Sequence, residues 1–222
     1  AARINEPVNP AWVDRWRQAE AAIVDLSDVP FPSEPAVVRT LNDALPTGAA
    51  LWIASSMPIR IMDAYFTPID RDVSLYGNRG ANGIDGLISS ALGSAAGGNR
   101  PTFVYAGDLS LLHDMTALAT AARMQVPITI VLVNNDGGGI FHLLPQADYP
   151  EAFEKHLGTP HGLDFSKIAA AFGVEHHLPT TRDALADLIA TPATSPRIIE
   201  IKTDRRESAD LLRQMWDRVA NG

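Results

Sequence analysis

The chain has 222 residues, of which 46% are hydrophobic and 20% are charged. This composition excludes a disordered chain, a collagen-like fibre and a bundle of membrane helices, and the length suits one large domain or two small ones. The net charge of −8 argues against a surface built to bind nucleic acid, and the lack of cysteine excludes disulfides and thiolate sites and favours the cytoplasm.

Residues 1–30 are predicted to be a linker that leads into one helix. The first residues lack the apolar segment of a signal peptide. Asn9 followed by Pro10 is typical of a helix start. The apolar residues behind it recur at helical spacing, at Trp12, Trp16, Ala19, Ile23 and Leu26. Because the opening is linker-like, we expect further domains upstream of a main domain at 31–222.

Strand and helix patterns alternate through the main domain, after a second helix that Ser33 is suited to cap. Short apolar runs predict strands at 51–53, 73–76, 103–105, 128–133, 174–178 and 198–201. Helical patterns lie at 58–65, 84–96, 111–124, 165–172, 182–189 and 208–219. The run at 128–133 is apolar on both faces, as in a central parallel strand. We therefore predict an α/β fold, a doubly wound, mainly parallel sheet of about six strands with helices on both faces.

The stretch at 143–163 has three prolines and little periodicity, and irregular segments of this length are usually functional loops. The chain has six histidines, and no two of them have the spacing of a metalloprotease motif. We predict that all six are structural or surface residues. His142, directly after Phe141, is the strongest candidate for another role.

Polar residues follow two neighbouring predicted strands. Asp108 ends one strand and Asn135 the next, 27 residues later, so a βαβ unit places a carboxylate beside an amide oxygen. Hard oxygen donors beside glycine-rich backbone suit Mg²⁺ that shares its coordination with a phosphate. Gly107 and the turn through Leu109 and Ser110 open a helix whose amides can meet a diphosphate. Each half alone is more often a simple turn or cap, and the pairing favours a site.

Several motifs resemble those of the diphosphate-binding domain of thiamine-diphosphate enzymes. They are Ser-Met-Pro-Ile-Arg at 56–60, Asn-Arg-Gly-Ala-Asn-Gly-Ile-Asp-Gly at 78–86, Gly-Asp-Leu-Ser-Leu-Leu-His-Asp at 107–114, Asn-Asn-Asp-Gly-Gly-Gly-Ile-Phe at 134–141 and Leu-Pro-Gln at 144–146. They look most like the synthases of menaquinone biosynthesis, which decarboxylate 2-oxoglutarate and add the succinyl carbanion to isochorismate. The likeness covers nearly all of this chain but only the C-terminal domain of the family. Leu109 stands where most of the family has a second glycine, which favours this branch.

The resemblance implies a site for thiamine diphosphate with Mg²⁺ or Mn²⁺. The implied metal ligands are the side-chain oxygens of Asp108 and Asn135 and the backbone carbonyl of Gly137. Ile84 matches an apolar residue that holds the cofactor bent, although its pattern alone equally fits a buried residue at a helix start. The implied cofactor-binding residues are Ile84, Gly107, Asp108, Leu109, Ser110 and Asn135.

The resemblance also implies substrate contacts. Ser56, Arg60 and Arg79 match positions that contact the carboxylates of 2-oxoglutarate or isochorismate, and guanidinium groups suit such anions in an acidic protein. Ile140 and Phe141 match an apolar wall above the cofactor ring, where water must be excluded. From the pattern alone, the same pair fits a hydrophobic helix start.

The implied transferase needs more than this chain. In the family, the glutamate that activates thiamine diphosphate belongs to an N-terminal pyrimidine-binding domain of a partner subunit, and this chain shows no likeness to that domain. We expect a homodimer or homotetramer with upstream pyrimidine-binding and central domains, no catalytic residue here and no turnover by the chain alone. Two alternatives stay open: another thiamine-diphosphate enzyme, such as an acetolactate synthase or a 2-oxo acid decarboxylase, and a non-catalytic cofactor-binding module.

Overall fold

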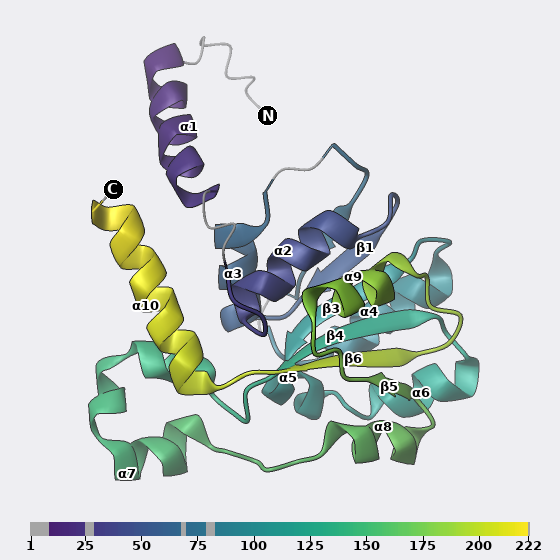
Figure 1. Cartoon of the computed structure of the whole chain (residues 1–222). Helices are drawn as coiled ribbons and strands as arrows, with labels where there is room; N and C mark the ends of the chain where they lie inside the picture. The colour runs from purple at the N-terminus through teal and green to yellow at the C-terminus, as the bar shows by residue number, and fades with distance from the viewer. Residues whose placement is uncertain (1–8, 25–28, 68–69, 79–82, 222) are drawn as a thin grey trace, which may run out of the picture.

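A parallel sheet forms the centre of the computed structural model, which describes residues 9–24, 29–67, 70–78 and 83–221 (Figure 1). Its strands are β1 (Ala50–Ile53), β2 (Ser74–Tyr76), β3 (Thr102–Gly107), β4 (Ile128–Asn134), β5 (Glu175–His177) and β6 (Arg197–Lys202). Their order is β2-β1-β3-β4-β6-β5, and every neighbouring pair is parallel. All of β4 is buried, and most of its residues on both faces are apolar. The predicted fold class is confirmed.

Helices cover both faces of this sheet (Figure 1). The α-helices are α1 (Pro10–Val24), α2 (Glu34–Ala44), α3 (Met57–Tyr65), α4 (Leu87–Gly97), α5 (Asp108–His113), α6 (Ala117–Met124), α7 (Pro150–Phe153), α8 (Phe165–Phe172), α9 (Arg182–Ala190) and α10 (Arg205–Asn221). One core joins α2, α3, α9 and α10 to the sheet, and the other joins α4, α6 and α8. Successive strand residues serve opposite cores: Phe103 and Tyr105 face the first, Val104 and Ala106 the second.

The first two helices begin where the sequence predicts. Pro10 opens α1, and the side chain of Asn9 accepts a hydrogen bond from the Ala11 amide at 3.0 Å. Ser33 caps α2, since its hydroxyl oxygen accepts from the Ala36 amide at 3.3 Å. Leu26, the last residue of the predicted apolar stripe on α1, lies outside the described residues.

The helix predicted at 111–124 is wrong as one element, because it divides into α5 and α6. Asp114 lies at the break, with φ −125° and ψ 25°. Its carboxylate accepts hydrogen bonds from the backbone amide and the hydroxyl of Ser89, at 2.7 and 2.9 Å. These bonds tie the break to α4, a contact between segments 25 residues apart that helical periodicity does not encode.

The stretch at 143–163 is less irregular than predicted. It contains short turns of 3-10 and π helix, namely the end of η1 (Gly139–Leu143), η2 (Pro145–Asp148) and η3 (Glu154–Gly158), beside α7. Arg205, the first residue of α10, holds η3 through an ion pair with Glu154 at 3.0 Å. A loop fixed in this way can place residues over the carboxyl edge of the sheet.

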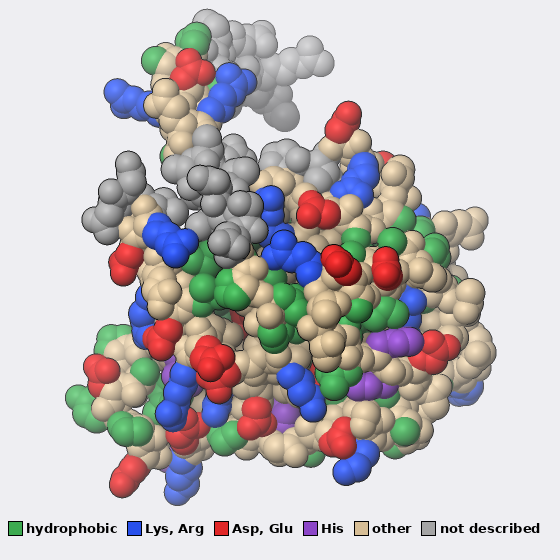
Figure 2. Space-filling view, viewed as in Figure 1, with side chains coloured by type: hydrophobic (Ala, Val, Ile, Leu, Met, Phe, Trp, Pro, Cys, Tyr) green, Lys and Arg blue, Asp and Glu red, His purple; other side chains and the backbone are tan. Residues whose placement is uncertain are grey.

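Acidic and basic side chains are interspersed on the face shown in Figure 2. Among the described residues, no helix is both long enough and apolar enough to span a lipid bilayer.

Candidate functional site

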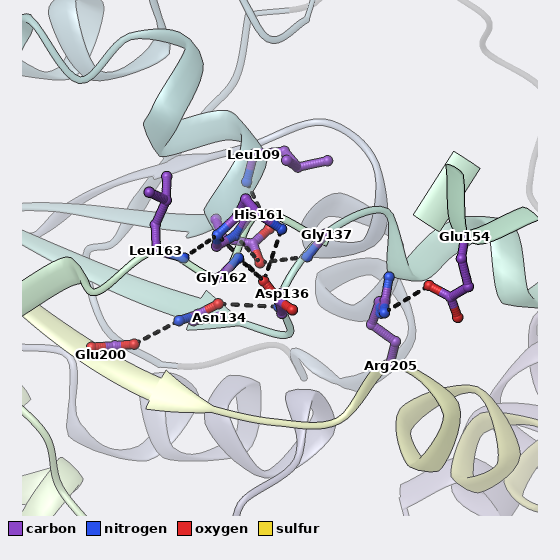
Figure 3. A network of polar contacts seen from close by, with 11 residues as sticks. Leu109, Asn134, Asp136, Gly137, Glu154, His161, Gly162, Leu163, Glu200 and Arg205 are labelled. Atoms are coloured by element: carbon purple, nitrogen blue, oxygen red, sulfur yellow. Dashed lines mark hydrogen bonds and ion pairs between the residues drawn. The ribbon is translucent and has the colours of Figure 1, made fainter. Parts of the chain in front are cut away.

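The carboxyl ends of β3 and β4 bring the two predicted metal-binding side chains together. The strands pair in parallel, with Gly107 opposite Val133, so Asp108 and Asn135 leave the sheet at the same edge. Asp108 is 2% exposed. Its Oδ1 accepts a hydrogen bond from the Leu109 amide at 2.7 Å, and its Oδ2 accepts one from the Gly137 amide at 2.9 Å (Figure 3). The carboxylate is therefore held across both strand ends.

The turn after β4 needs its glycines because another loop crosses it closely. Gly137 has φ +131°, a backbone conformation that side chains rarely adopt, and an added Cβ would lie 2.0 Å from the carbonyl oxygen of Gly158. The Gly138 amide donates to that same carbonyl at 2.8 Å. The glycine-rich turn thus allows η3 to pack directly onto the site.

A buried polar chain supports the same turn from β6. Glu200, 1% exposed, accepts from Nδ2 of Asn134 at 2.7 Å, and Oδ1 of Asn134 accepts from the Asp136 amide at 3.1 Å. His176 contacts the other carboxylate oxygen of Glu200 at 2.8 Å. Figure 3 shows Asn134 between Glu200 and Asp136, linked to each by a dashed line. They fix the turn that carries Asn135.

A cavity of about 220 Å³ opens between these strand ends, α2 and α3. Its lining includes most of the predicted site residues: Ser56, Ile84, Gly107, Asp108, Leu109, Ser110, Asn135, Gly137, Ile140 and Phe141. Glu34, Ser55 and Tyr105 also line it. Ser56 has φ +72°, a strained conformation of the kind found at ligand sites. The structure therefore gathers metal-binding, cofactor-binding and apolar candidates around one space.

Of the two predicted arginines, Arg60 does not line this cavity. Arg60 is exposed and donates from Nη1 to the carbonyl oxygen of Ser56 at 2.7 Å. It borders a neighbouring cavity of about 490 Å³ between α3 and β2. Arg79, with the rest of 79–82, lies outside the described residues.

Several buried polar atoms around the first cavity have no hydrogen-bond partner within the described part of the chain. They are Oδ1 of Asn135, Oε2 of Glu34, the Tyr105 hydroxyl and the Ser55 hydroxyl. Unsatisfied buried oxygens are rare and call for a ligand or an ion. The Asn135 oxygen beside the Asp108 carboxylate fits a hard cation such as Mg²⁺. No group of three His, Cys, Asp or Glu side chains suits a metal among the described residues, so a cation here depends on amide and carbonyl oxygens as well.

Glu34 and Tyr105 are site residues that the sequence analysis missed. Glu34, the first residue of α2, is 4% exposed, and its Oε1 accepts from Nδ2 of Asn135 at 3.4 Å. The pKa of Glu34 is raised to about 7. Burial is the largest cause, the hydrogen bond from Asn135 acts in the opposite direction, and the charge of Asp108 adds to the rise. Burial, with the nearby charge of Glu34, also raises the pKa of Tyr105 well above its usual value. Acidic residues are ordinary in a first helical turn, so only the packing of α2 reveals Glu34.

His161 contacts the site through Asp108 without being among the residues that line the 220 Å³ cavity, and this supporting contact is compatible with the structural role predicted for every histidine. Its Nδ1 accepts from the Leu163 amide at 3.0 Å, so the neutral ring carries its proton on Nε2. Nε2 then donates to Oδ2 of Asp108 at 3.2 Å (Figure 3). The Asp136 carboxylate accepts from the His161 and Gly162 amides at 3.0 and 2.8 Å and anchors this segment.

His142 has a different place. It is 8% exposed and packs on Phe153, with ring centroids 4.4 Å apart. Burial and the charge of Arg205 lower its pKa, which favours the neutral ring. His142 thus helps to hold α7 near α10 and is not among the residues lining the 220 Å³ cavity.

Comparisons with known proteins point to one family. Residues 61–201 match the family described as "Thiamine pyrophosphate enzyme, C-terminal TPP binding domain". Thiamine pyrophosphate (TPP) is another name for thiamine diphosphate. Two relatives are named 2-succinyl-5-enolpyruvyl-6-hydroxy-3-cyclohexene-1-carboxylate synthase. The one from Listeria welshimeri is 41% identical over 219 residues, which cover 96% of this chain and 38% of the relative. The one from Myxococcus xanthus is 45% identical over 204 residues, which cover 90% and 34%.

A solved structure supports the fold. Benzoylformate decarboxylase from Polynucleobacter necessarius matches with a TM-score of 0.64 and 19% identity, over 79% of this chain and 34% of that one. This chain spans less than two fifths of the length of the curated relatives named above.

Proposed function

Because the chain belongs to the family of C-terminal TPP-binding domains of thiamine pyrophosphate enzymes, we propose that it is the Mg²⁺- and diphosphate-binding part of a 2-succinyl-5-enolpyruvyl-6-hydroxy-3-cyclohexene-1-carboxylate synthase. The observation that carries this proposal is the pair at the ends of β3 and β4. Asp108 is buried there, and the oxygen of Asn135, which lines the same cavity, lacks a partner within the described chain. The two relatives named above support the synthase in preference to another enzyme of the family or a non-catalytic module.

The cation would be held by oxygens of this chain. The Asp108 carboxylate, Oδ1 of Asn135 and the carbonyl of Gly137 supply hard donors, and the diphosphate supplies the rest. The backbone amides of Leu109 and Gly137 already donate to Asp108 and keep its carboxylate in place. The chain's part in this half of the site is to fix donor atoms before the ligand arrives.

The remaining lining would shape the reaction space. Thiamine diphosphate supplies, when bound, an electron sink for breaking the bond beside a keto group. Ile84, Ile140 and Phe141 line the cavity with apolar surface that excludes water from the cofactor. In the proposed reaction, 2-oxoglutarate loses CO₂ and its remaining four-carbon unit is added to isochorismate.

Substrate carboxylates would be bound from the α3 side. Ser56 lies on the cavity wall, and Arg60 borders the neighbouring cavity four residues later in the chain. A guanidinium can grip a carboxylate with two parallel hydrogen bonds, which matters in a protein with a net charge of −8. We assign the same role to Arg79 by its resemblance to the family motif.

The whole enzyme would contain more than this chain. We propose that residues 1–30 connect the domain at 31–222 to upstream domains, and that a partner subunit supplies the activating glutamate in a cytoplasmic homodimer or homotetramer. The chain alone is then expected to bind the cofactor without decarboxylating 2-oxoglutarate. Turnover of 2-oxoglutarate by the purified 222-residue chain would contradict this division of labour.

Calorimetric titration of thiamine diphosphate tests the proposed site. We expect the chain to bind the cofactor with Mg²⁺ present and to lose that binding when the metal is removed. Asp108→Ala should abolish the Mg²⁺-dependent binding, because it deletes a ligand that two backbone amides hold in place. Asp114→Ala, a matched change that breaks the link to Ser89, should keep it. Equal affinity in the Asp108 variant and the unchanged chain would refute the assignment.

A further inference from the structure

Glu34 lies against the proposed metal site although it is 101 residues away from Asn135 in the chain. Its carboxylate is 4% exposed and accepts a hydrogen bond from Nδ2 of Asn135 through one oxygen, while the other oxygen has no partner within the described chain. Burying a carboxylate with so few partners costs free energy, so this placement does not serve stability. A role in the site would account for it.

The side chain of Asn135 has two ends, and only one can bind a cation. Its amide carries an oxygen acceptor and a nitrogen donor of nearly equal size, so packing alone does not distinguish the two orientations. A carboxylate accepts hydrogen bonds and repels another oxygen. Glu34 therefore selects the orientation in which Nδ2 faces α2 and Oδ1 faces away from Glu34, on the cavity.

Gly139 leaves room for this orientation. A Cβ built at Gly139 would lie 2.6 Å from Nδ2 of Asn135, closer than atoms can approach. The amide nitrogen thus sits between the bare Cα of Gly139 and the carboxylate of Glu34. The missing side chain leaves space for this end of the amide, and the buried acid determines that the nitrogen occupies it.

The charges of the cavity agree with a cation. Asp108 and Glu34 are the two carboxyl groups among the described lining residues, and no lysine or arginine is among those residues. A divalent ion between these carboxylates and an incoming diphosphate would offset charges that otherwise repel one another.

We propose that Glu34 is a positioning residue that orients the Asn135 amide so that its oxygen binds the cation. The inference rests on the proposed function, because it takes the cavity to be a metal and diphosphate site. It extends that function by adding a residue of α2 that touches no reacting atom and acts through Asn135.

This role is tested by titrating Mn²⁺ into the chain in the presence of thiamine diphosphate. The electron paramagnetic resonance signal of free Mn²⁺ measures how much of the metal is bound. Glu34→Leu removes the acceptor and should weaken Mn²⁺ by about tenfold or more, the usual effect of losing a residue that orients a metal ligand. Glu34→Gln keeps a carbonyl acceptor for Nδ2 and should restore most of the affinity. Thr40→Val is a matched control on α2, because the Thr40 hydroxyl donates only to Ala36 within that helix and its loss should leave Mn²⁺ affinity unchanged.

A second readout follows the amide itself. In nuclear magnetic resonance spectra of the metal-free chain, the side-chain NH₂ signals of Asn135 should shift in Glu34→Leu and move much less in Glu34→Gln or Thr40→Val. Their assignment comes from their absence in Asn135→Asp.

The outcomes separate the inference from the function on which it rests. Wild-type Mn²⁺ affinity in Glu34→Leu, or equal weakening in the Leu and Gln variants, would overturn the orienting role and leave the proposed function standing. Failure of the unchanged chain to bind Mn²⁺ with the cofactor would overturn the proposed function, and the inference with it. Glu34→Leu should fold, because it replaces a buried carboxylate with an apolar side chain.

Discussion

The bond from His161 to Asp108 is a contact whose removal has a calculable effect. His161→Ala deletes an N–H that donates to a carboxylate 2% exposed, at 3.2 Å. Hydrogen bonds to charged groups contribute about 1.5–3 kcal/mol, so we expect the segment around His161 to lose about 2 kcal/mol of protection against opening. At about 1.4 kcal/mol for each tenfold change, this corresponds to roughly 30-fold faster local opening.

Hydrogen exchange measures this effect residue by residue. The His161 and Gly162 amides donate to Asp136, and the Gly138 amide donates to Gly158, so all three report on the loop that crosses the site. We expect their exchange to accelerate by roughly 30-fold in His161→Ala, while amides in the centre of the buried strand β4 change only with global stability.

His156→Ala provides the matched control, because His156 is an exposed histidine of η3 in the same loop. The exchange rates in the His156→Ala variant should equal those of the unchanged chain. The reasoning would be refuted if, in His161→Ala, the exchange rates of the amides at positions 138, 161 and 162 stayed within threefold of those in the unchanged chain. The bond to Asp108 would then contribute little to holding the loop.

Three further outcomes follow. In the metal-free chain, the free energy of unfolding should fall as the pH rises from 4.5 towards 7, because Glu34 ionises near 4.5 when unfolded and at about 7 when folded. This fall can reach at most about 3 kcal/mol. Denaturant unfolding at a series of pH values measures it, and Glu34→Gln should show no such fall. Gly137→Ala should lower the melting temperature and abolish cofactor binding, since its Cβ would meet Gly158 at 2.0 Å; an unchanged melting curve would contradict this. Arg60→Ala in the complete enzyme should raise the KM for 2-oxoglutarate with a smaller change in kcat, and an unchanged KM would exclude the proposed contact.

The sheet and the pairing of Asp108 with Asn135 were predictable because they depend on local patterns. Apolar runs of strand length correspond to all six strands, and the consecutive strands β3 and β4, with α5 and α6 between them in the chain, pair in parallel. Once β3 and β4 are neighbours, the residues after them must share an edge. The predicted juxtaposition therefore needed no knowledge of side-chain packing.

The residues that surround this pair were not predictable in the same way. Tyr105 lies in an apolar strand run and looks like core, although it lines the cavity and its buried hydroxyl has no partner in the described chain. His161 lies in a stretch without periodicity, 53 residues from the carboxylate it contacts. Both depend on long-range packing, which a pattern in one sequence does not record.

The break between α5 and α6, which the sequence did not predict, has the same origin. Asp114 is an ordinary helix residue by composition, yet its carboxylate bonds to Ser89 at the start of α4. Aspartate side chains compete with the helix for backbone donors, and here a donor on another helix prevails. The break ends α5 after six residues, close behind Asp108.

The charge of the cavity determines how its proposed ligands depend on one another. The residues that line it in the described chain include Asp108 and Glu34 and no lysine or arginine. A diphosphate entering alone would meet carboxylates at short range in a poorly solvated space, whereas a cation bound to Asp108 and Asn135 reverses the sign of that interaction. Because binding free energies are linked, the cofactor must then tighten the metal by the same factor by which the metal tightens the cofactor. An acidic cavity in an acidic protein can thus hold an anionic cofactor without a basic side chain of its own.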